Sequence, residues 1–76
     1  MKELIEFIVK ALVDDPSAIE VEEVEAEKTT TFKLRSAKND IGKVIGKRGR
    51  TASAIRTIMT AVSARQGKKA VLEILE

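Results

Sequence analysis

A glycine-bracketed turn between two helical patterns restricts the fold of this chain more than any other feature. The turn spans Gly46–Gly49 and reads Gly-Lys-Arg-Gly. Glycines at both ends allow the backbone to bend sharply and to approach another backbone closely, because they carry no Cβ. A short helix is expected over 40–45, with its N-cap among residues 36–39. A longer helix is expected over 51–65, closed by Gly67. The two helices must therefore meet at a sharp corner that carries two cationic side chains.

The N-terminal third predicts one helix and one strand. Apolar residues recur with helical spacing over 4–12, and Pro16 ends that pattern. Residues 19–21 alternate apolar and acidic side chains, as in a half-buried strand. The apolar phase then slips by one position at Val24, which predicts either a β-bulge or a frayed strand end near 22–23.

Two further strands complete the pattern. Residues 29–35 are rich in β-branched side chains, and residues 70–75 alternate weakly. A tight hairpin at 26–28 would join the first two strands. The order is α-β-β-α-α-β in a single domain of residues 1–76. It predicts an α+β fold in which a three-stranded sheet packs against three helices.

The composition excludes most catalytic chemistry. The 76 residues include no cysteine and no histidine. Disulfides and zinc sites built from thiolate or imidazole are therefore excluded, and no nucleophile–base pair can be assembled. We expect no enzyme activity, no metal, no cofactor and no small-molecule substrate. No apolar run approaches 20 residues and glutamates interrupt the first segment, so neither a membrane span nor a signal peptide is expected. A cytoplasmic location follows by default.

The net charge of +2 conceals a strong polarity along the chain. Residues 1–27 hold two basic and nine acidic side chains, a net of −7. Residues 28–76 hold twelve basic and three acidic side chains, a net of +9. The basic part suggests a polyanionic partner, with two solvated faces as the alternative interpretation.

The turn has the parts of a phosphate-binding site. It offers an open backbone, two cations, and the free N–H groups at the start of the next helix. Lys38, Lys43 and Arg50 widen the positive rim, and aliphatic side chains border it. The candidate binding residues are Ile41, Gly42, Lys43, Val44, Ile45, Gly46, Lys47, Arg48, Gly49 and Arg50. P-loop and dinucleotide-binding motifs fail on spacing, while an ordinary helix–helix turn with solvated cations remains the alternative.

Aromatic residues limit the type of nucleic-acid fold. Only Phe7 and Phe32 are present, and both are expected in the core. A sheet that stacks bases on exposed aromatic rings is therefore not predicted. An aliphatic groove combined with a phosphate clamp is the remaining possibility.

The run over 40–51, Asp-Ile-Gly-Lys-Val-Ile-Gly-Lys-Arg-Gly-Arg-Thr, continued by Ala-Ile-Arg at 54–56, resembles the signature of a KH domain. The element order is similar to the type II arrangement, with a signature region over 29–76. A single such domain resembles the KhpA family, small bacterial single-KH-domain RNA-binding proteins. The specific part of this resemblance covers 36–76, and the N-terminal third agrees in pattern only.

The resemblance implies a clamp for about four single-stranded nucleotides. Gly46–Gly49 would meet the sugar-phosphate backbone, and the strand over 30–35 would form the opposite wall of the groove. We expect a single-stranded RNA-binding protein of low sequence specificity, acting as an RNA chaperone. The family also implies a partner KH protein, KhpB, and a role in control of cell elongation and division. The alternative is a protein-interaction adaptor in which RNA binding is secondary.

The long helix has an apolar arc wider than one core-facing side requires. Ile55 and Val62 lie at the middle of the arc and should face the sheet. Ala54, Ile58 and Ala61 lie at its edge. This edge is expected to contact a second copy or the partner KH protein, giving a homodimer or heterodimer. The alternative is that the N-terminal helix covers it.

Overall fold

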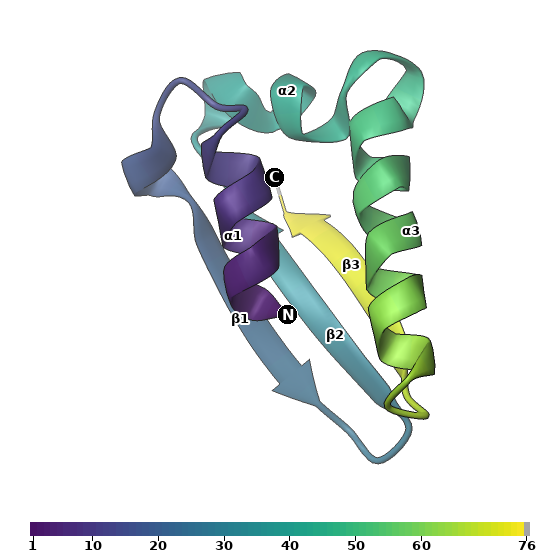
Figure 1. Cartoon of the computed structure of the whole chain (residues 1–76). Coiled ribbons are helices and arrows are strands. Elements are labelled where there is room, and N and C mark those ends of the chain that lie inside the picture. Colours follow the sequence, from purple (N-terminus) through teal and green to yellow (C-terminus); the bar gives the residue numbers. More distant parts are fainter. Residues whose placement is uncertain (76) are drawn as a thin grey trace.

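The computed structural model describes residues 1–75, which form three α-helices and three strands joined by short turns (Figure 1). The helices are α1 (Lys2–Lys10), α2 (Ile41–Ile45) and α3 (Arg50–Ala64), and the strands are β1 (Glu20–Glu25), β2 (Thr29–Arg35) and β3 (Lys69–Leu75). Short 3₁₀ turns lie at Pro16–Ala18, Lys38–Asp40 and Lys47–Gly49. This order of elements confirms the α-β-β-α-α-β prediction.

β2 occupies the centre of the sheet. It pairs antiparallel with β1 and parallel with β3, so Phe32 lies between Glu23 and Leu72. The helices cover one face of the sheet, with α1 over β1 and α3 over β3, while α2 crosses one end (Figure 1). This is the α+β fold expected for a type II KH domain.

The core lies between the sheet and the helices. Thr30, Phe32 and Leu34 of β2 point toward the helices and are buried, as strand alternation requires. The helices and the other strands contribute further buried apolar side chains: Ile5, Val9, Val21, Val44, Ile55, Met59 and Leu72. Val62 is half-buried, whereas α3 buries Ala52, Ile55, Met59 and Ser63, so its buried stripe is centred near Met59.

β1 differs from its prediction. Its six residues pair with Arg35 to Thr30 in unbroken register as far as Glu25, so both the bulge and the frayed end expected near 22–23 are wrong. Val24 is instead 43% exposed, on the sheet face that the helices leave open. An edge strand with one face in water need not keep its apolar alternation to the end. The hairpin prediction is confirmed, because the Ala26 amide donates to the Thr29 carbonyl at 2.8 Å.

The two phenylalanines have opposite environments. Phe32 is 2% exposed, as predicted, but Phe7 is 74% exposed, so its predicted place in the core is wrong. The buried side of α1 carries Ile5 and Val9. Phe7 lies two residues from each of them, about 200° around the helix, and therefore points away from the sheet.

Candidate nucleic-acid interface

The turn Gly46–Gly49 joins α2 to α3 at one end of the molecule (Figure 1). The Gly46 amide donates to the Gly42 carbonyl at 2.8 Å and ends α2. The Gly49 amide then donates to the Gly46 carbonyl at 3.0 Å and closes the 3₁₀ turn. The corner predicted from the sequence is therefore present, and α3 begins at Arg50.

The two glycines are required for different reasons. Gly46 has φ +81°, and a Cβ there would lie 2.1 Å from Thr51 Oγ1 and 2.7 Å from the Thr51 amide nitrogen. Gly49 has φ +72°, but a Cβ there would meet no atom within 4 Å. Gly46 therefore permits a close approach to the start of α3, whereas Gly49 supplies only a left-handed backbone.

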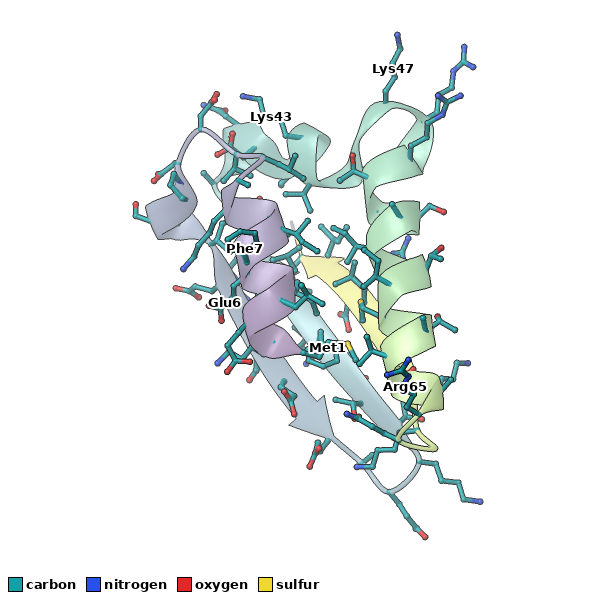
Figure 2. The ribbon with its side chains drawn as sticks, viewed as in Figure 1. Met1, Glu6, Phe7, Lys43, Lys47 and Arg65 are labelled. Atoms are coloured by element: carbon teal, nitrogen blue, oxygen red, sulfur yellow. The ribbon has the colours of Figure 1, made fainter. Side chains whose placement is uncertain are left out.

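Arg48 also has a left-handed backbone, with φ 58° and ψ 27°. This conformation costs a non-glycine residue about 1–2 kcal/mol. Arg48 is exposed, and the neighbouring Lys47 points away from the body of the molecule (Figure 2). The ion pairs of residues 1–75 include neither side chain, nor that of Arg50. Backbone strain of this kind is typical of functional sites, so the turn that carries the two free cations is a candidate binding site.

Lys43 is a different type of cation. Its ammonium group donates to the carboxylate of Asp14 and lies 3.9 Å from Asp40 Oδ1. The hydrogen bond and charge of Asp14, together with the charge of Asp40, raise the pKa of Lys43 above its usual 10.5, although desolvation opposes them. Lys43 therefore stays charged at neutral pH, but its charge is largely neutralised by these two carboxylates.

Asp40 anchors α2 to the chain segment that follows α1. It is 2% exposed, and its two carboxylate oxygens accept the amides of Asp14 at 3.2 Å and Asp15 at 3.0 Å. Asp40 stands at the cap position of α2, so the prediction of a cap among residues 36–39 is wrong. Its side chain accepts no hydrogen bond from the amides of α2, because both oxygens accept the amides of the distant segment. No local pattern in the sequence signals this role.

The apolar candidates are divided between core and surface. Val44 is fully buried and therefore offers no surface for a ligand, whereas Ile41 and Ile45 are half-buried. Ile41 borders a hollow of about 560 Å³, whose other lining residues are Arg35, Ser36 and Lys38. Both edges of β2 are paired within the sheet. Of the strand over 30–35, Arg35 lines this hollow.

A comparison with known protein families identifies the relationship of this chain. The sequence model of the KH domain of KhpA and KhpB matches residues 2–74. The chain belongs to the KhpA/KhpB KH-domain family.

Its relatives in the KhpA/KhpB family are similar over their whole length. The RNA-binding protein KhpA of Aquifex aeolicus is 49% identical over 76 residues, covering 100% of this chain and 96% of the relative. The protein of the same name from Chlamydia trachomatis is 49% identical, covering 100% and 97%. That of Clostridium perfringens is 48% identical over 75 residues, covering 99% and 100%.

A solved structure outside the KhpA/KhpB family shares the fold. It is a crystal structure of Era in complex with MgGDPNP and nucleotides 1506–1542 of 16S ribosomal RNA. The TM-score is 0.68 and the identity is 18%, over 96% of this chain and 28% of that longer chain. At this identity the likeness supports the fold alone.

The α3 edge of this KhpA/KhpB family member lies open. Ile58 is 41% exposed and its neighbours Ala54 and Ala61 are exposed, so the alternative that α1 covers them is wrong. Arg56, about 160° from Ile58 around α3, donates to the Leu72 carbonyl of β3 at 3.4 Å. The Ile58 side of α3 therefore points away from the β3 edge.

Within residues 1–75 no helix is long and apolar enough to cross a membrane. The same residues contain no cluster of three or more side chains suited to hold a metal ion.

Proposed function

We propose that this chain binds single-stranded RNA through the turn Gly46–Gly49, with little sequence specificity. The observation that carries the proposal is the pair of exposed cations, Lys47 and Arg48, held on a strained backbone beside the start of α3. Relatives at 46–49% identity bear the name RNA-binding protein KhpA, which supports the same ligand.

The geometry suggests how a strand would be held. The Arg50 amide donates to the Lys47 carbonyl, but no side chain caps α3, so the next N–H groups and the positive end of the helix would be available to a phosphate. Lys47, Arg48 and Arg50 would neutralise adjacent phosphates. Lys43 would contribute less, because Asp14 and Asp40 already hold its ammonium group.

Bases would lie against the apolar side of α2. Ile41 and Ile45 offer aliphatic surface, while Arg35 and Lys38 line the adjoining hollow. Aliphatic contacts and phosphate contacts carry little base information, which is the reason for the low specificity. A binding site of about four nucleotides fits a KH clamp of this type.

We propose an RNA chaperone of the cytoplasm, without enzymatic activity, that works with the partner KH protein KhpB in control of cell elongation and division. The exposed edge of Ala54, Ile58 and Ala61 would contact either a second copy or that partner. The support is that one family model describes the KH domains of both KhpA and KhpB.

The clamp is tested by reversing its two free charges. In the variant Lys47→Asp/Arg48→Asp, binding to a fluorescein-labelled single-stranded RNA should weaken by about 100-fold in anisotropy titrations near 100 mM salt. Both side chains are exposed, so circular dichroism should show an intact fold. The control is Lys28→Asp/Arg65→Asp, which makes the same charge change away from the turn. Arg65 lies at the opposite end of the molecule (Figure 2), and Lys28 lies between β1 and β2, where its carbonyl accepts the Lys69 amide. An equal loss in the control would contradict a localised clamp.

A second function, a protein-interaction adaptor, is favoured by the exposed Ile58 edge. Capture of partners from lysate with and without nuclease separates the two functions. Partners that survive nuclease and are lost in Ile58→Asp support the adaptor. Partners that nuclease removes support RNA binding as the primary function.

A further inference from the structure

The outward side of α1 is apolar although nothing in residues 1–75 covers it. Phe7 is 74% exposed and Leu4 is 40% exposed, and they lie three residues apart on one stripe of the helix. Exposed Ala11 follows four residues later, just beyond the end of α1. Phe7 belongs neither to the core nor to the clamp, because it lies on α1 while the clamp lies between α2 and α3 (Figure 2).

Charges flank this stripe in a specific order. Glu3 and Lys10 are seven residues apart, close to two helical turns, so they lie on the same side of the stripe. Phe7 lies near the midpoint between them. Their present partners hold them weakly: Glu3 is 3.9 Å from the N-terminal amine, and Lys10 is 3.8 Å from Glu6. Exposed pairs at such distances exchange at little cost.

This order of charges is complementary to itself. If two copies of α1 pack antiparallel about a two-fold axis near Phe7, Glu3 of each copy lies opposite Lys10 of the other. Parallel packing would instead put the charged flanks of the two copies on opposite sides of the contact, so that neither Glu3 nor Lys10 would meet an opposite charge. The two phenylalanine rings would meet at the centre, where an aromatic pair adds to the burial of apolar surface.

We propose that α1 is a self-association surface, on which a second copy of this chain docks with its own α1 antiparallel. The surface is distinct from the Ile58 edge of α3. A helix of nine residues is about 13 Å long, so the contact is smaller than the interfaces of stable dimers. The dimer is therefore weak and forms at high local concentration.

The two-fold axis would leave the clamps free and point them in opposite directions. α1 runs toward the end of the molecule that carries the turn (Figure 1). An antiparallel partner therefore carries its own turn at the far end of the dimer. If the proposed RNA binding holds, a dimer offers two clamps to one strand or joins two strands, which raises the effective local concentration.

Sedimentation equilibrium over a wide concentration range tests the docking in an Ile58→Asp background, where the α3 edge cannot contribute. The expected result is a concentration-dependent dimer that weakens as salt rises. Adding Phe7→Ser should weaken it by about 10-fold, because the central aromatic pair is lost. Circular dichroism should show an unchanged fold, since Phe7 is exposed.

A reciprocal charge exchange tests the antiparallel geometry. Glu3→Lys alone and Lys10→Glu alone should each weaken the dimer, and the double variant should restore it. A chain that stays monomeric at every concentration, a dimer that tolerates Phe7→Ser, or a double variant as weak as the singles overturns the proposal. RNA anisotropy is compared at protein concentrations at which sedimentation shows only monomer. Phe7→Ser should leave that affinity unchanged, so a failure of docking is distinguishable from a failure of RNA binding.

Discussion

Two lysines that lie four residues apart, Lys43 and Lys47, have opposite environments. Lys43 is on α2, where Asp14 and Asp40 hold its ammonium group. Lys47 is on the turn, exposed and outside every ion pair found in the described residues. The corner thus has an anchored half, fixed to the rest of the molecule by carboxylates, and a free half that presents charge. A count of nearby cations in the sequence does not distinguish the two halves.

The free half depends most strongly on Gly46. Gly46→Ala should lower the free energy of unfolding by about 3 kcal/mol and abolish RNA binding, because the new Cβ would clash with Thr51 while φ stays positive. Gly49→Ala carries only the φ penalty and should cost about 1 kcal/mol. Gly42→Ala is the helical control and should be neutral or stabilising, since its Cβ meets nothing. Urea denaturation measures all three, and equal losses at Gly46 and Gly49 would refute the close approach.

The anchored half depends on Asp40. Asp40→Ala leaves the amides of Asp14 and Asp15 without their acceptor and should cost about 2 kcal/mol of stability in urea denaturation. Asp14→Asn keeps both backbone donors and removes only the exposed pair with Lys43, so its effect should be small. If Asp14→Asn destabilises as much as Asp40→Ala, the ion pair and not the carboxylate–amide contact holds the anchor.

The two lysines themselves give the smallest but most direct contrast. Lys47→Ala should weaken single-stranded RNA binding by about 10-fold. The slope of the logarithm of the binding constant against the logarithm of salt concentration should become shallower by the amount expected for about one phosphate contact. Lys43→Ala should change the affinity by no more than about twofold, because its charge is already compensated. Anisotropy titrations at several salt concentrations measure both variants. Equal effects would show that RNA displaces the carboxylates from Lys43.

Local pattern was sufficient for the element order and for most element bounds. The predicted strand over 29–35 coincides with β2, and the predicted long helix over 51–65 is α3 shifted by one residue. Both are long segments in which the spacing of apolar or β-branched residues is regular. The glycine turn between the helices also limits how the chain can pass from one helix to the next. The residues that present charge at the turn could also be named in advance, because their exposure follows from the turn itself.

The remaining features depend on contacts between distant segments. Asp40 meets amides 25 and 26 residues away, and Lys43 meets a carboxylate 29 residues away. No local spacing encodes such pairs. The core prediction for Phe7 is wrong because it rests on the apolar side chain alone, although surfaces that no other element covers also tolerate apolar residues. α2 has only five residues, and Val44 is the one that it buries in the core.

The contact between Asp40 and the segment after α1 has a consequence for which substitutions the chain can accept. The carboxylate recognises main-chain N–H groups, which every residue but one provides. Positions 14 and 15 can therefore vary widely in side chain without loss of the tether, while proline at either of them would remove a donor. Selection for this contact would therefore conserve the residue at position 40 alone. A search for pairs of positions that vary together would not detect the contact.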